Sequence, residues 1–151
     1  MSNRNEDNPI IGRNFQKHVQ KALSKEFHSK FEPEVAIPIG CPAKDHKFDL
    51  TNADRSIVAE CKCYTWTDSG NVPSAKLMGL DEAVFYFGFL PASTRKLLCM
   101  KKAVYPGKAE TLAEYYVRRH GHLLSDVVVY EISENGAIRE IKNTSNSGNS
   151  Q

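Results

Sequence analysis

Long apolar runs are missing from this sequence, and no stretch approaches the roughly 20 residues that a membrane-spanning helix needs. Nothing near Met1 reads as a basic segment followed by the apolar core of a secretory signal. An excess of one charge is also missing, since the formal net charge at pH 7 is +2. This balance does not by itself indicate a protein that coats nucleic acid nonspecifically. We therefore expect a cytoplasmic protein with no membrane partner.

Cysteine is too scarce for a disulfide scaffold. The four cysteines lie in or near apolar runs, at Cys41, Cys61, Cys63 and Cys99. A chain with its own core does not need disulfides, so we predict buried free thiols. A zinc site built from Cys41, His46, Cys61 and Cys63 is an alternative, although C-x-C along a strand is not the C-x-x-C spacing of a zinc knuckle.

The sequence also lacks internal repeats and any Pro/Gly/Ser-rich linker long enough to divide two domains. A chain of 151 residues suits one domain that buries roughly two-thirds of its unfolded surface. Both ends are polar and poor in apolar groups. We predict one domain over residues 9–141, with flexible tails over 1–8 and 142–151.

Apolar periodicity predicts helices that alternate with strands. Helical spacing marks residues 12–30, 74–87 and 112–120. Short apolar or alternating runs predict strands at 34–39, 47–51, 57–64, 97–104 and 127–132. The order α-β-β-β-α-β-α-β predicts an α/β fold with a mixed central β-sheet flanked by helices.

Strand alternation predicts which side chains share a face. Within 47–51, Phe48 and Leu50 should point to one side and Asp49 to the other. Within 57–64, Glu60 and Lys62 should share one face of the strand. The two segments should pair as a hairpin, because the residues between them supply turn chemistry.

Asp49, ten intervening residues and then Glu60-Cys61-Lys62 form the pattern D-x(n)-E-x-K. This pattern, with the order of helices and strands, resembles the PD-(D/E)XK nucleases, which implies a restriction-endonuclease-like fold. The resemblance implies a metal-dependent phosphodiesterase, an endonuclease rather than an exonuclease, with DNA as the expected nucleic acid. Asp49 and Glu60 would hold Mg²⁺, for which Mn²⁺ could substitute, and the backbone carbonyl of Cys61 would be a further ligand.

The chemistry of phosphodiester hydrolysis gives these residues plausible roles. The substrate is anionic, so cleavage needs a cation that neutralises developing charge and acidifies the attacking water. Magnesium prefers oxygen ligands such as the carboxylates of Asp49 and Glu60. Lys62 would place an ammonium group beside the water and the phosphate, while a role as general base depends on how far its pKa is lowered.

Two further residues are candidate supporting groups. The family often carries a Glu on its first helix that reaches the metal, and this sequence offers Gln16 there. Lys76, in the first turn of the second helix, is a candidate contact to the scissile phosphate. Gln16 and Lys76 could each instead be a solvated surface residue. The same holds for Glu60 and Lys62, since Glu and Lys at i and i+2 on an exposed strand face are often solvated residues without a catalytic role.

Two other functions fit the same residues. The neutral amide of Gln16 favours a binding or assembly module that keeps the nuclease fold without efficient catalysis. A zinc-stabilised nucleic-acid-binding domain is a second alternative. A homodimer would let two sites cut both strands, although the sequence identifies no interface.

The aromatic residues after the E-x-K segment have two interpretations. Tyr64 and Trp66 could stack on bases or line the substrate cleft beside the 69–71 turn. Packing in the core or at its rim explains them equally well.

Overall fold

A computed structural model describes residues 9–143 of the chain. Of the predicted tails 1–8 and 142–151, residues 1–8 and 144–151 lie outside the described residues. The chain forms an α/β fold with a six-stranded mixed sheet and three α-helices in the described part. Its elements are α1 (Pro9–Phe27), β1 (Phe31–Ile39), β2 (Lys44–Asn52), β3 (Ile57–Lys62), α2 (Ser74–Phe87), β4 (Arg95–Lys101), α3 (Leu112–His120), the short 3₁₀ helix η1 (Gly121–Leu123), β5 (Val128–Ile132) and β6 (Ile138–Ile141).

The strands follow one another across the sheet in the order β1-β2-β3-β4-β5-β6. β3, β4 and β5 are parallel, whereas β1–β2, β2–β3 and β5–β6 are antiparallel pairs. The parallel connections run through α2 and α3, as parallel crossovers require. The predicted mixed sheet flanked by helices is therefore confirmed, but the predicted order was one strand short because it ended at β5.

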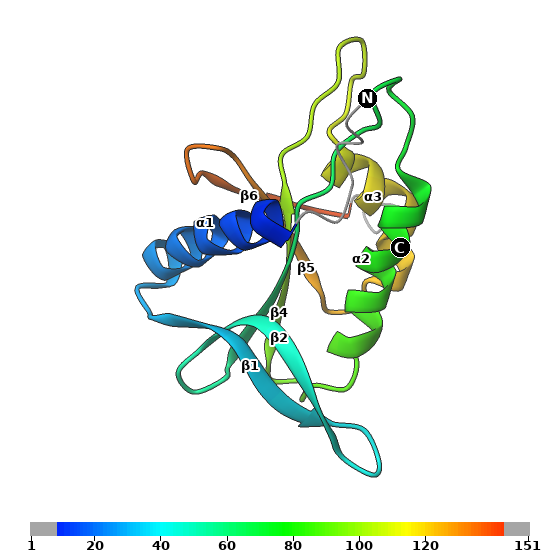
Figure 1. The fold of residues 1–151 in the computed structure, drawn as a ribbon. Helices are drawn as coiled ribbons and strands as arrows, with labels where there is room; N and C mark the ends of the chain where they lie inside the picture. Colours follow the sequence, from blue (N-terminus) through cyan, green and yellow to red (C-terminus); the bar gives the residue numbers. More distant parts are fainter. Residues whose placement is uncertain (1–8, 144–151) are drawn as a thin grey trace, which may run out of the picture.

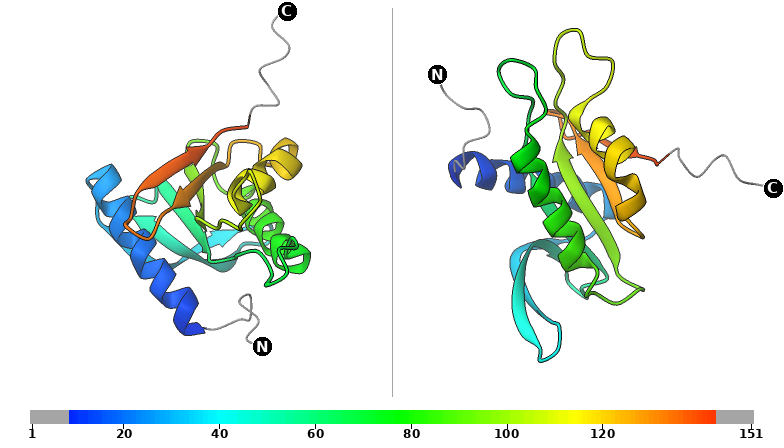
Figure 2. Two further views of the ribbon diagram at one scale, coloured as in Figure 1. Left: turned by 90° about the horizontal axis from the view of Figure 1, so that it is seen from above. Right: turned by 90° about the vertical axis from the view of Figure 1, so that its right-hand side faces the viewer.

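Helices cover both faces of the sheet. Figure 1 shows α1 on one side of the strands and α2 with α3 on the other, and Figure 2 shows the same arrangement from two further directions. One apolar cluster joins α1 to the sheet through the buried residues Phe15, Val19, Ala22 and Leu23. The other joins the opposite face to α2 and α3. The helical stripes predicted from the sequence supply both clusters.

The helix ends have local causes. α1 starts at Pro9, since proline suits the first helical position, and it ends near His28, whose φ of 48° is left-handed. It therefore stops short of the predicted end at residue 30. α3 starts with a capping box, in which the Thr111 hydroxyl accepts from the backbone N–H of Glu114 and the Glu114 carboxylate accepts from the backbone N–H of Thr111.

The alternation predicted for β2 is wrong at its centre. Phe48 belongs to the cluster on the α2 side, and Leu50 belongs to the cluster on the α1 side. The pairing with β1 steps from Val35–Phe48 to Pro33–Leu50, so no pair forms at Asp49, and Glu34 opposite has a φ of 52°. A local break in the ladder reverses the faces here, as irregular ladder positions do in sheets.

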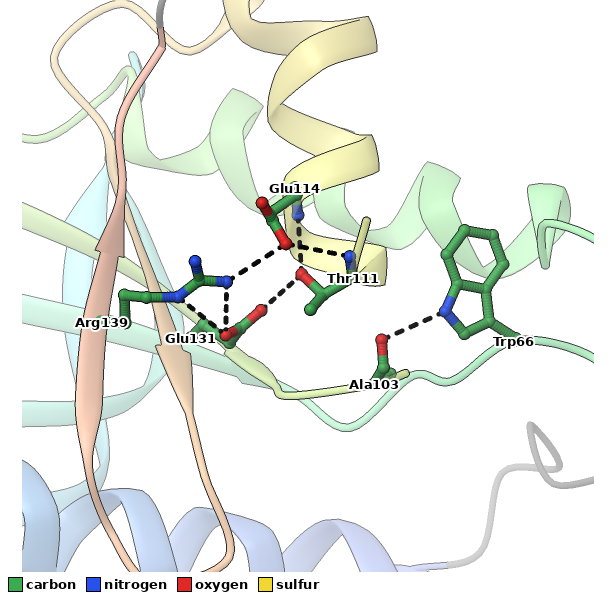
Figure 3. Close-up of polar contacts among 6 residues, drawn as sticks. All are labelled: Trp66, Ala103, Thr111, Glu114, Glu131 and Arg139. Carbon is green, nitrogen blue, oxygen red and sulfur yellow. Dashed lines mark hydrogen bonds and ion pairs between the residues drawn. The ribbon is translucent and has the colours of Figure 1, made fainter. Parts of the chain in front are cut away.

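The strand β6 was not predicted; it pairs with β5 through the backbone, and a buried acid on β5 binds an arginine on β6 (Figure 3). Glu131 on β5 is only 1% exposed, and its Oε1 accepts hydrogen bonds of 3.1 and 2.8 Å from the Arg139 guanidinium on β6. Its Oε2 accepts a 2.6 Å hydrogen bond from the Thr111 hydroxyl. Arg139 also pairs with Glu114 at 3.3 Å. The charged network ties β5, β6 and the start of α3 together, and it satisfies a carboxylate that would otherwise be costly to bury.

The cysteine prediction is confirmed in part. All four thiols are free, and Cys99 is buried. Cys61 and Cys63 are half-buried, whereas Cys41 lies exposed, contrary to the prediction.

None of the helices within residues 9–143 has the length and apolar character needed to cross a membrane.

Candidate active site

The sheet brings Asp49 and Glu60 together where β2 and β3 stop pairing through their backbones. The regular register covers Thr51–Val58 and Leu50–Ala59, and the next residues along are Asp49 and Glu60. There, hydrogen bonds from backbone to side chain take the place of backbone pairing. Glu60 Oε1 accepts from the Asp49 backbone N–H at 3.2 Å, and Asp49 Oδ2 accepts from the Cys61 backbone N–H at 2.8 Å. Each carboxylate is thereby fixed by a backbone donor on the opposite strand.

Glu60 sits in an environment that resists its ionisation. The residue is 8% exposed. Burial first, and then repulsion from the Asp49 carboxylate, raises the pKa of Glu60 to about 8, while the Lys62 ammonium acts in the opposite direction. A hydrogen bond with the Asp49 side chain also favours the protonated form. The two acids therefore form a close pair that cannot easily carry two negative charges without a cation.

Lys62 completes the group at the end of β3. Its side chain is half-buried, and its positive charge acts to lower the pKa of Glu60. Cys61, between them, packs with the cluster on the α1 side, and Val58 packs on the α2 side, so alternation places Glu60 and Lys62 toward the α2 side. The structure thus brings Asp49, Glu60 and Lys62 together. The role of the Cys61 carbonyl as a ligand stays a prediction.

Gln16 and Lys76 have different relations to this group. The Gln16 side-chain amide on α1 donates to the backbone carbonyl of Asp49 at 3.3 Å. Gln16 therefore supports the backbone at the break in β2 and brings no third carboxylate. Lys76 lies half-buried in the first turn of α2, and its supporting role also stays a prediction.

The segment that follows Lys62 is held by contacts that the sequence did not reveal. Trp66 is 2% exposed, and its indole N–H donates to the Ala103 carbonyl at 3.1 Å (Figure 3). The Tyr105 hydroxyl donates to the Asp68 carbonyl at 3.0 Å. Trp66 therefore packs in the core and does not offer its ring to bases. Only the apolar character of Trp66 could have suggested this, since its partner Ala103 lies 37 residues away.

The donor set fits a hard cation better than zinc. Within residues 9–143, no three side chains of His, Cys, Asp and Glu gather as a metal site. His46 instead stacks on Tyr86 with ring centroids 3.8 Å apart, and Cys41 is exposed, so the zinc alternative lacks its ligands. Two carboxylates suit magnesium, which keeps several waters and needs few protein ligands. A cation between Asp49 and Glu60 would also relieve their repulsion.

Comparison of the chain with models of protein families, with curated proteins and with solved structures gives no match. What the site can do therefore has to follow from its own groups. Two fixed carboxylates and an ammonium group at one strand end can hold a divalent cation beside an anionic ester. This combination suits phosphoryl chemistry.

Proposed function

We propose that this chain is a PD-(D/E)XK nuclease with a restriction-endonuclease-like fold, which hydrolyses nucleic-acid phosphodiester bonds with magnesium. One observation supports the proposal most directly. The Glu60 carboxylate accepts from the backbone N–H of Asp49, and the Asp49 carboxylate accepts from the backbone N–H of Cys61. The positive charge of Lys62 acts to lower the pKa of Glu60 in the same pair. A pair of acids with a nearby amine is what hydrolysis of an anionic ester requires.

Each residue would have a distinct role in the hydrolysis. The carboxylates of Asp49 and Glu60 would hold Mg²⁺, with Mn²⁺ as a substitute, and the Cys61 carbonyl would add a ligand. The bound cation would supply charge neutralisation and acidify water. Lys62 would orient the attacking water and stabilise the negative charge that develops on the phosphate oxygens. Water adds to phosphorus while one P–O ester bond breaks, which leaves a hydroxyl end and a phosphate monoester.

The backbone around the acids would keep this arrangement in place. The Asp49 and Cys61 backbone N–H groups each bind one carboxylate oxygen, so both acids are anchored at the strand end where the cation would bind. Gln16 supports the carbonyl of Asp49 from α1. Such fixed geometry matters, because small displacements of catalytic groups cost large factors in rate.

We expect DNA to be the substrate and internal bonds to be the point of attack. The test is a magnesium-dependent cleavage assay over circular and linear DNA, single strands, branched junctions and RNA. Cleavage of circular DNA would identify an endonuclease. Lys62→Ala should lower the rate at least about a hundredfold, as removal of a group that stabilises the transition state does.

Matched variants make the assay decisive. Lys47→Ala removes an exposed lysine of β2 and should leave cleavage unchanged. Asp49→Asn and Glu60→Gln keep the shape of each acid and should abolish magnesium-dependent cleavage. Cleavage that survives Lys62→Ala in a folded protein would reject the mechanism.

A second candidate is a nucleic-acid-binding or assembly module that retains the fold. The observation in its favour is that α1 brings the neutral Gln16 to the backbone of Asp49 and no third acid to the site. Binding of DNA without cleavage under every metal tested would support this module. Its affinity should then be insensitive to Lys62→Ala.

A further inference from the structure

The outer side of α2 is an apolar surface with no cover in the described chain. Met78, Phe85 and Phe89 are 70%, 65% and 48% exposed, and they make up three of the seven exposed large apolar side chains in the described residues. Met78 and Phe85 lie seven residues apart, two helical turns or about 10 Å along one side of the helix. The opposite side of α2 packs on the sheet. A helix that is apolar on both sides usually has a partner on each.

The same surface contains a groove that the exposed Phe85 and Phe89 rings themselves help to line. It has a volume of about 340 Å³ and lies between the end of α2 and the β1–β2 hairpin. Phe85 meets Phe89 edge to face with ring centroids 5.3 Å apart, and Tyr86, which also lines the groove, stacks on His46 of the hairpin. Protruding apolar side chains and a receptive apolar groove therefore lie next to each other.

The charges around this surface indicate what could cover it. Lys44 and Asp45 line the groove at the hairpin, and Glu82 lies between Met78 and Phe85 on the exposed side of α2. A surface with one cation and two acids would not attract the anionic phosphate backbone of a nucleic acid. An antiparallel approach of an identical surface would instead bring Glu82 of each copy toward Lys44 of the other.

We propose that two copies of this chain pair through the outer side of α2, with the α2 helices antiparallel about a two-fold axis. Such an interface is isologous, so the protruding side chains of each copy fill the groove of the other in a single contact. Met78 of one copy then lies near Phe89 of its partner. The pairing uses none of the residues of the candidate active site and does not depend on the proposed nuclease activity.

The mass of the full chain in solution tests the pairing. Sedimentation equilibrium with a metal chelator and without nucleic acid should give the mass of two 16.9 kDa chains, with dissociation on dilution. Phe85→Glu should raise the dissociation constant at least about tenfold, because it places a charge where an aromatic ring would be buried. A monomer at every concentration would overturn the proposal.

Matched variants locate the interface. Val104→Glu adds the same charge at a side chain that is 67% exposed and lies outside α2, so it should leave the dimer intact. Glu82→Lys should weaken the dimer, and adding Lys44→Glu to the same chain should restore it. Met78→Lys provides a second test if circular dichroism shows that Phe85→Glu has not folded. A dimer that resists folded Phe85→Glu and Met78→Lys would overturn the proposed surface.

Discussion

Replacing Glu60 by Gln should stabilise the metal-free protein, increasingly so as the pH rises. Gln has the shape of Glu and keeps an oxygen that can accept the backbone N–H of Asp49, but it never ionises. In the native protein, burial and then the Asp49 carboxylate raise the pKa of Glu60 from 4.5 to about 8. The substitution therefore removes a carboxyl group whose charged form destabilises the folded state.

The sign and the size of the effect follow from proton linkage. Between pH 4.5 and about 8, the folded protein keeps a proton on Glu60 that the unfolded chain releases. The stabilisation from this proton is complete below pH 4.5 and is lost as the pH rises through about 8. At about 1.4 kcal/mol per pH unit, the whole window is worth roughly 3–5 kcal/mol. This is a large part of the stability of a typical domain.

Urea unfolding from about pH 5 to about pH 9, in the presence of a chelator, measures this difference. Trp66 is the only tryptophan and is buried, so its fluorescence reports unfolding directly. The free energy of unfolding of the wild type should fall relative to that of Glu60→Gln across the range. Glu134→Gln, at an exposed acid, should follow the wild type. A difference between wild type and Glu60→Gln that does not change with pH would refute the reasoning.

Magnesium should reverse the alkaline loss of stability. A cation that binds the folded state alone stabilises it according to its concentration and affinity. Near pH 8, magnesium should therefore raise the stability of the wild type and leave Glu60→Gln almost unaffected. The effect should shrink progressively as the pH falls below about 8, because protons compete with the cation for Glu60. No response to magnesium at any pH would argue against the proposed metal site without any assay of cleavage.

Further substitutions test the packing that holds the site. Arg139→Met should cost roughly 2–4 kcal/mol in urea unfolding, since it leaves the buried Glu131 carboxylate without its cation; a loss below about 0.5 kcal/mol would contradict this. Gly12→Ala should instead stabilise by about 0.5–1 kcal/mol in thermal unfolding, because the position is helical and open. Gly79→Ala should show no such gain, since its Cβ would lie 2.6 Å from the Tyr64 hydroxyl. An equal gain at both glycines would show that Tyr64 moves aside freely.

Local patterns in the sequence were sufficient to predict most of the fold. Helical spacing gave the buried stripe of α1, because one helix face packs on one sheet face. The alternation of β3 was correct, and it placed Glu60 and Lys62 on one side of the strand because β3 pairs regularly with β4 over its whole length. The relation between Glu60 and Asp49 was also predictable, since a short turn between antiparallel strands fixes which residues lie opposite.

Features that depend on distant partners could not be predicted in this way. β6 is only four residues long, and the Asn135-Gly136 turn that leads into it, with Gly136 at a φ of 86°, was a local hairpin signal that the sequence-based prediction missed. The pairing of Arg139 with Glu131 across that hairpin could not be read from a local pattern. Trp66 was ambiguous because its partner Ala103 belongs to a loop after β4. Cys41 lies in an apolar run but at an exposed turn, so composition alone misassigned it.

The error in β2 connects the fold to the candidate site. Simple alternation would put Phe48 and Leu50 on one face, and it fails because the ladder breaks at Asp49. Regular backbone pairing between β2 and β3 ends at Leu50–Ala59, so it does not engage the backbone N–H groups of Asp49 and Cys61. The break leaves both groups to the carboxylates of Glu60 and Asp49, which are fixed in place as a result. A variant that restored regular pairing here should therefore keep the fold, release both acids and lose the response of stability to magnesium.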